Sequence, residues 1–174
     1  MPRKNAGEND PQTDEDQTLS FTAEEKHVVQ PLFSFILSAT YEEKRQLIAA
    51  HPELLTPIAD AVMARIIEIK HKAGEEQDAH GIQNWREFLA DVRSRNFDYA
   101  LARSSVYRVF VEMPDRPAEW NSYLRGVAHR EEALRRKEGD IALDEFAKKM
   151  AARVPAVAAA FQGLRSLLKQ LEKG

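Results

Sequence analysis

The sequence predicts an all-α fold of about eight helices arranged as antiparallel helical hairpins. Apolar residues recur at spacings of three and four through almost the whole chain after residue 20, which is the period of an amphipathic helix. The 174 residues include only 7 Gly and 8 Pro, too few for a loop-rich β-sandwich. One stretch, 106–111, has the composition of a strand, but the chain offers it no second strand, so we expect a helix there as well.

Three helices of the first half are expected to begin at threonines that stand at N-cap positions: Thr22, Thr40 and Thr56. The second of them should end near Ala50, and the third should end at Gly74. Pro31 falls inside the first helix, where a missing N–H and a ring clash predict a kink or a split.

Five further helices are indicated by apolar stripes. The fourth covers about 79–95, and the fifth runs from Asn96 to a break at 113–117. The sixth carries its stripe from Trp120 through Leu134, and Gly139-Asp140 is expected to end it and to cap the seventh. The eighth begins at Pro155.

Pairs of these helices begin near residues 22, 57, 98 and 140, which gives spacings of 35, 41 and 42 residues. Such spacings are typical of helical-hairpin repeats. No residue-level similarity between the four pairs is visible in the sequence, so a closed bundle and a short open repeat array both remain as architectures.

The chain contains no Cys, which excludes disulfides, thiolate metal sites and cysteine nucleophiles. Residues 1–19 are acidic and poor in apolar side chains, so we expect a disordered tail followed by one helical domain over 20–174. The N-terminus is not a signal peptide, and no apolar run reaches the length of a membrane span, which favours a cytoplasmic protein.

Two Glu-x-x-His pairs, Glu24…His27 and Glu68…His71, match one element of a di-iron helical bundle. Helical rotation places both pairs away from the apolar faces, whereas metal ligands in a bundle project inward. A helical-bundle metal protein is therefore a remote alternative. We assign no catalytic, cofactor-binding or metal-binding residue and expect no enzyme activity and no cofactor.

A nucleic-acid-associated regulator is the stronger alternative. Residues 103–174 carry 14 basic and 10 acidic side chains, with the densest basic cluster at Arg130, Arg135, Arg136 and Lys137. Glutamates interleave with that cluster and would repel phosphate, so an ion-paired surface is favoured over a nucleic-acid interface. Trp85 and Trp120 lie on continuous apolar stripes and are expected in the core.

Residues 41–102 contain His51-Pro52-Glu53-Leu54-Leu55-Thr56-Pro57, followed by Ala59-Asp60, the Gly74-Glu75 turn and Trp85-Arg86 to Leu89. This stretch resembles a helical "HPELL" segment found beside tetratricopeptide-repeat and CHAT (caspase-like) domains in large bacterial multidomain proteins. The resemblance implies a non-catalytic helical segment associated with protein interaction. We therefore expect a scaffold or adaptor whose partner is another protein.

Overall fold

The computed structural model describes residues 20–173, and within them it contains α-helices, short 3-10 helices and no strand. The all-α expectation is confirmed, whereas the expected acidic tail, 1–19, lies outside the described residues. The α-helices are α1 (Ala23–Leu37), α2 (Tyr41–Ala50), α3 (Pro57–Lys72), α4 (Glu76–Ser94), α5 (Phe97–Val111), α6 (Trp120–Arg130), α7 (Lys137–Ala151) and α8 (Pro155–Leu171). The 3-10 helices are η1 (Pro52–Leu55), η2 (Pro117–Glu119) and η3 (Glu132–Arg135).

The threonine caps form as expected. Thr22 and Thr40 each accept a hydrogen bond from the backbone N–H three residues ahead, completing capping boxes, and Thr56 caps α3. Gly74 adopts a φ of 74°, the left-handed conformation that ends α3 and that glycine adopts without steric cost. Pro31 does not split its helix: α1 runs without interruption through it, and its ring is buried.

Residues 106–111 lie in α5, which confirms the helical interpretation of that stretch. The expected end of the sixth helix was wrong. α6 ends at Arg130, since Glu131 leaves the helical region with φ −91° and ψ 84°, and η3 follows. Gly139 therefore lies inside the first turn of α7, buried against Leu134, and does not end a helix.

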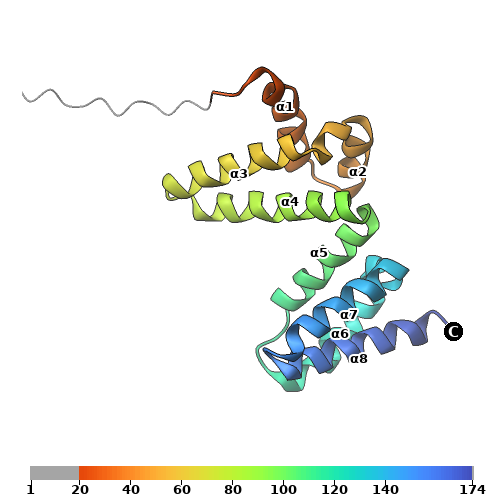
Figure 1. Ribbon diagram of the computed structural model, residues 1–174. Helices are drawn as coiled ribbons and strands as arrows, with labels where there is room; N and C mark the ends of the chain where they lie inside the picture. The colour runs from red at the N-terminus through yellow and green to blue at the C-terminus, as the bar shows by residue number, and fades with distance from the viewer. Residues whose placement is uncertain (1–19, 174) are drawn as a thin grey trace, which may run out of the picture.

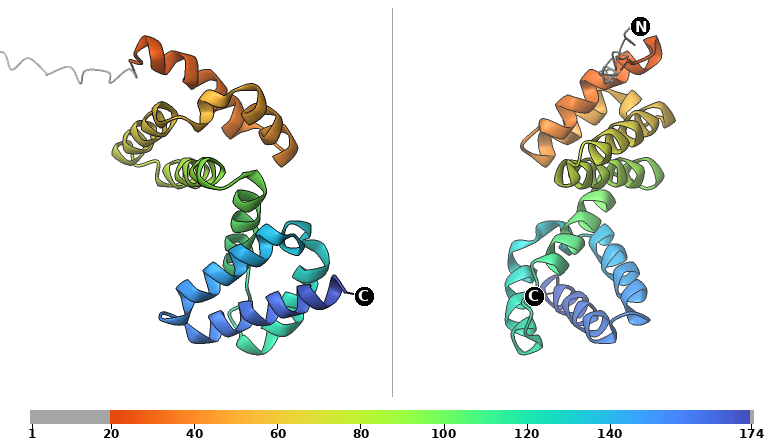
Figure 2. Two further views of the ribbon diagram at one scale, coloured as in Figure 1. Left: turned by 45° about the vertical axis from the view of Figure 1, so that its right-hand side comes forward. Right: turned by 90° about the vertical axis from the view of Figure 1, so that its left-hand side faces the viewer.

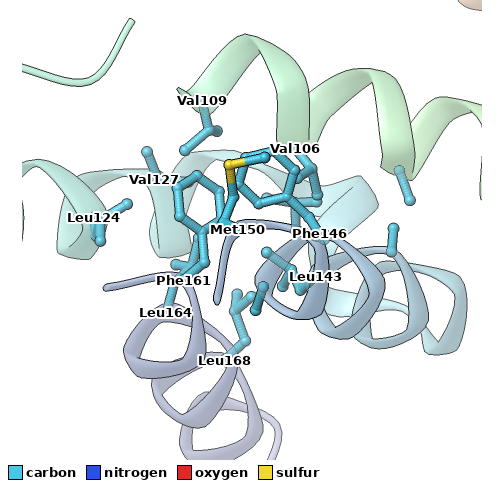
Figure 3. Packing of buried hydrophobic residues seen from close by; sticks show 14 of the residues in the cluster. Val106, Val109, Leu124, Val127, Leu143, Phe146, Met150, Phe161, Leu164 and Leu168 are labelled. Carbon is cyan, nitrogen blue, oxygen red and sulfur yellow. The ribbon is translucent and has the colours of Figure 1, made fainter. Parts of the chain in front are cut away.

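The hydrophobic core is divided into two clusters, and α5 contributes to both. The helices likewise form two groups joined by α5 (Figures 1 and 2). The first cluster joins α1, η1, α3 and α4 with the start of α5. The second joins the rest of α5 with α6, η3, α7 and α8, and its apolar side chains point toward one another from all four helices (Figure 3). α5 leads from the upper group of helices to the lower one, so it fixes how the two groups sit relative to each other.

The two groups repeat one arrangement, which we name the first unit (α1–α4) and the second unit (α5–α8). Each unit contains a helix, a shorter helix, a 3-10 turn and an antiparallel pair of longer helices, and the second unit has the additional short helix η2 before α6. A shift of 74 positions carries the buried residues of α1 onto buried residues of α5: Val28 to Ala102, Pro31 to Ser105, Leu32 to Val106 and Phe35 to Val109.

The repeat extends through the rest of both units. A shift of 80 positions carries buried residues of η1 and α3 onto η3 and α7: Leu54 to Leu134, Val62 to Ala142, Met63 to Leu143, Ile66 to Phe146 and Ile67 to Ala147. A shift of 79 positions relates α4 to α8: Ala79 to Ala158 and Leu89 to Leu168. The repeating element is therefore a four-helix unit, twice the length of the hairpins that the sequence indicated.

One ion pair is also repeated at equivalent positions. In the first unit Arg86 of α4 donates from Nε and Nη2 to the two carboxylate oxygens of Asp60, at 2.9 and 2.8 Å. In the second unit Arg165 of α8 does the same to Asp140, at 2.5 and 2.8 Å. Each pair joins the first turn of one long helix to the middle of its antiparallel neighbour, so its repetition indicates a role in building the unit.

Lys44 of α2 is buried in the first unit, and the shift of 80 positions carries it onto the buried Leu124 of α6. Its Nζ donates to the carbonyl oxygens of Phe35 and Ser38, at 2.6 and 2.8 Å, and so caps the C-terminus of α1. It also lies 4.2 Å from the centroid of the Trp85 ring, a cation–π contact. Burial lowers the pKa of Lys44 below its ordinary value of 10.5.

Both tryptophans pack against the cores, as the sequence predicted. Trp85 meets Phe35 edge to face, with ring centroids 5.6 Å apart, and Trp120 packs on the second cluster while its Nε1 donates to the carbonyl oxygen of Pro114. None of the helices in the described part of the chain has the length and hydrophobicity needed to span a bilayer.

Candidate functional site

A groove of about 720 Å³ lies where the two units meet. α5 forms its base, α4 of the first unit forms one wall, and Lys149 of α7 reaches it from the second unit. Its lining includes Glu87, Asp91, Arg103, Tyr107, Val111 and Lys149. Because it combines elements of both units, the groove exists only when the units are packed as they are here.

The base of the groove follows from the spacing of residues in α5. Arg103, Tyr107 and Val111 recur every four residues and line the groove, and Tyr99, one turn earlier, lines the smaller pocket described below. Arg103 Nη1 donates to both carboxylate oxygens of Asp91, at 2.7 and 2.6 Å, and ties α5 to α4. The Arg103 guanidinium also lies over the Tyr107 ring, 5.4 Å from its centroid.

Contacts on the other side tie the same helix face to α7. Lys149 Nζ donates to the Tyr107 hydroxyl at 2.9 Å, and the Tyr99 hydroxyl donates to the Glu145 carboxylate. A smaller pocket of about 210 Å³ continues between these side chains and shares Arg103, Tyr107 and Lys149 with the groove. Polar contacts therefore hold α4, α5 and α7 together along the groove.

The two tyrosines of this face have pKa values displaced in opposite directions. Burial, followed by the Glu145 carboxylate, raises the pKa of Tyr99 to about 12. Burial also acts to raise the pKa of Tyr107, but hydrogen bonding and charge from Lys149 and Arg103 outweigh it, so this pKa lies below the ordinary 10.0. Neighbouring cations thus favour the ionised phenol at Tyr107, and a neighbouring carboxylate favours the neutral phenol at Tyr99.

The groove offers apolar surface beside these polar groups. Val111 is 79% exposed, which is unusual for a valine, while Phe88 and Ala100 contribute buried floor. The charged side chains of the walls have both signs, and Arg103 pairs with Asp91 and Glu87. Such a surface can accept apolar side chains and form hydrogen bonds at its edge, which suits non-covalent binding.

The Glu-x-x-His pairs lie on the surface. Glu24, His27, Glu68 and His71 are all exposed, as the helical rotation predicted. Glu68 accepts from Lys72, and His71 contacts Glu76, at 2.7 Å in each pair. Among residues 20–173, no group of three or more His, Asp or Glu side chains is arranged to hold a metal ion.

The basic cluster of the second unit extends from the end of α6 to the start of α7. Arg130 lies near Tyr123 and Glu112 at the end of α6. Arg135, Arg136 and Lys137 line a separate pocket of about 280 Å³ where η3 meets the start of α7. The Arg135 guanidinium donates back to the carbonyl oxygens of Ala128 and His129, next to Arg130, so Arg135 stands between the end of α6 and the corner that holds Arg136 and Lys137.

The groove itself was not found from the sequence. Arg103 and Tyr107 were available as a polar pair at helical spacing, but their partners Asp91 and Lys149 come from other helices. Only the packing of the two units brings these groups together.

No family model matches the chain, and comparisons with curated proteins and with solved structures likewise return no similar protein.

Proposed function

We propose that the chain is a non-catalytic helical scaffold that binds another protein, and that the groove along α5 receives an amphipathic helix of that partner. The observation that carries the proposal is the groove of about 720 Å³ with the largely exposed Val111 among its lining residues. Grooves between helices are a recurrent site for helical peptides, whose apolar anchors enter the groove while their polar side chains meet its edge.

The charge of the groove supports a protein partner rather than a strongly charged polymer. Glu87, Asp91 and Glu112 oppose Arg103, Arg108 and Lys149 on its walls. A nucleic-acid backbone binds best to an excess of cations, which this groove does not have. A partner helix with charges of both signs finds complementary groups on each wall.

The repeated construction of the molecule also supports a scaffold. Stacked helical units present extended concave surfaces made from several elements, and proteins built this way use those surfaces for binding. The resemblance of residues 41–102 to a helical segment found beside interaction repeats agrees with this function.

A site-directed cross-linking experiment tests the proposal. A photoreactive amino acid replaces Ser104, which lines the groove, and in a matched protein it replaces Gln162, an exposed position of α8. After irradiation in the native cell, we expect one protein to be linked through Ser104 and not through Gln162. The linked protein is then purified and mixed with the unmodified chain, and a stoichiometric complex is expected.

Two outcomes would contradict the proposal. One is equal cross-linking from both positions, because a groove-specific partner touches only the first. The other is a linked protein that forms no complex with the purified chain.

A further inference from the structure

A second candidate binding site is a pocket at the start of α7. It has a volume of about 280 Å³ and lies between η3, α7 and α8. Five cationic side chains line it, against two carboxylates, Asp140 and Glu172. The cations are Arg135, Arg136, Lys137, Arg165 and Lys169.

Comparison with the first unit separates what the fold requires from what is particular to this pocket. The Asp140–Arg165 pair has its counterpart in Asp60–Arg86, so that pair belongs to the common construction. Arg135-Arg136-Lys137, in contrast, occupies the positions of Leu55-Thr56-Pro57. The same backbone corner is thus built in the first unit with no charge at all.

The residue that precedes the long helix has nearly the same backbone conformation in both units. Thr56 has φ −88° and ψ 160°, and Arg136 has φ −85° and ψ 166°. In the first unit the Thr56 hydroxyl accepts a hydrogen bond from the N–H of Ala59 at 3.4 Å. Arg136 has no acceptor to offer, and α7 has no side-chain cap. At this corner the second unit therefore has three cations in place of the side-chain cap that Thr56 provides in the first unit.

One of the two carboxylates of the pocket, Asp140, is already paired within the chain. Arg165 binds Asp140 through two nitrogens, and Lys169 Nζ lies 3.0 Å from the same carboxylate. Arg135 donates to the backbone oxygens of Ala128 and His129. Arg136 lies 3.0 Å from Glu132 and 3.6 Å from Asp98, on the exposed surface, where ion pairs exchange readily with solvent and ligands. Lys137 is exposed and has no ion-pair partner among the side chains of residues 20–173.

We propose that this pocket binds a small phosphate-type oxyanion, either inorganic phosphate or the phosphate group of a small ester. Guanidinium groups match the oxygens of such an anion in pairs, and a Lys ammonium adds a point charge. The N–H groups of the first turn of α7 lie next to these cations and supply further donors. A volume of about 280 Å³ is near the lower limit for small-molecule pockets, which favours a compact anion over a large ligand.

The proposal is tested by titrating the full chain with inorganic phosphate at constant ionic strength, monitored through the backbone amide signals of Glu138 and Gly139. Saturable shifts of these two signals are expected. Arg136→Thr and Lys137→Gln should each weaken phosphate binding by about tenfold, the loss of about 1.4 kcal/mol of binding free energy. Arg136→Thr installs the residue that caps the first unit, so this variant is expected to remain folded, and a thermal melt checks that it does.

Arg153→Gln is the matched control, because it removes one positive charge beyond the other end of α7 and should leave phosphate affinity unchanged. Three results would overturn the proposal. Shifts that grow without saturation, or an equal loss in Arg153→Gln, would indicate general screening. Binding of a short DNA duplex through Arg136 and Lys137, without saturable phosphate binding, would assign the corner to nucleic acid instead.

Discussion

Arg165 holds Asp140 in the same two-point contact that Arg86 makes with Asp60, although the pairs lie in different units and their neighbours in sequence differ. The Arg165 pair, with help from Lys169, lowers the pKa of Asp140 from 3.8 to about 2. Each pair links the two long antiparallel helices of its unit. Both units therefore use the same contact to hold these helices together.

This pair predicts a specific acid sensitivity. A carboxylate whose pKa is lowered on folding stabilises the folded state above its unfolded pKa, and that stability is lost as the pH falls through the folded value. Wild-type protein should therefore lose stability between about pH 4 and about pH 2 in part through Asp140. Asp140→Asn should lower the free energy of unfolding at neutral pH by about 1 kcal/mol, because solvent screens the partly exposed pair.

Denaturant unfolding of wild type and Asp140→Asn at neutral and acid pH measures this effect. The difference between the two proteins should shrink as the pH falls through the window. A difference that stays constant down to about pH 2 would show that the pair does not stabilise the folded state through its charge.

The two units differ in how tightly the 3-10 turn approaches the long helix, and Gly139 marks the closer approach. A Cβ added at Gly139 would lie 2.4 Å from the backbone oxygen of Leu134, so the backbone must move to accept it. Gly139→Ala should therefore destabilise the protein by about 1–3 kcal/mol. The equivalent residue of the first unit is Ala59, where the turn leaves room for the methyl group.

Gly163→Ala is the control for this prediction. Gly163 lies in the middle of α8, and a Cβ there meets no atom within 4 Å. Alanine should stabilise that helix by about 0.5–1 kcal/mol. Thermal melts of the two variants should shift in opposite directions, and a Gly139→Ala protein as stable as wild type would contradict the close contact with Leu134.

Lys44 predicts an alkaline dependence of stability. Burial lowers the pKa of its ammonium in the folded protein, so the unfolded chain binds the proton more tightly. The free energy of unfolding should then rise as the pH increases toward 10.5, relative to a variant that lacks the amine. Lys44→Met removes the charge, keeps most of the length of the side chain and places an apolar residue where the second unit has Leu124.

Unfolding of wild type and Lys44→Met should be compared at about pH 7 and about pH 10, at which the other titrating groups contribute equally to both proteins. The free energy of unfolding of wild type, relative to that of Lys44→Met, should be larger at the higher pH. If wild type instead gained stability relative to Lys44→Met at the lower pH, the carbonyl and aromatic contacts would favour the ammonium by more than burial opposes it.

The sequence predicted where helices begin better than where they end or how they pack. The caps at Thr22, Thr40 and Thr56 were found because capping depends on residues a few positions apart. The end of α6 was missed, since Glu131 is neither glycine nor proline and the apolar stripe continues to Leu134. Nothing local in the sequence marks that break.

The repeat was hidden for a different reason. The units share burial rather than residue identity, as Phe35 and Val109 illustrate, and the shift between them changes from 74 to 80 to 79 positions. A search for similar residues at one fixed spacing cannot detect a repeat of buried positions whose spacing varies. The groove depended on the repeat in turn, since its partners Asp91 and Lys149 belong to different units.

The repeat supplies the most direct test of the scaffold proposal. Leu37 and Val111 occupy equivalent positions at the ends of α1 and α5, and each is 79% exposed, but only Val111 lies in the α5 groove. The decisive measurement is the dissociation constant of the cross-linked partner for Val111→Glu and for Leu37→Glu. Val111→Glu should weaken binding by at least about tenfold while Leu37→Glu binds as wild type does. Equal affinities for the two variants would contradict a partner bound in the groove.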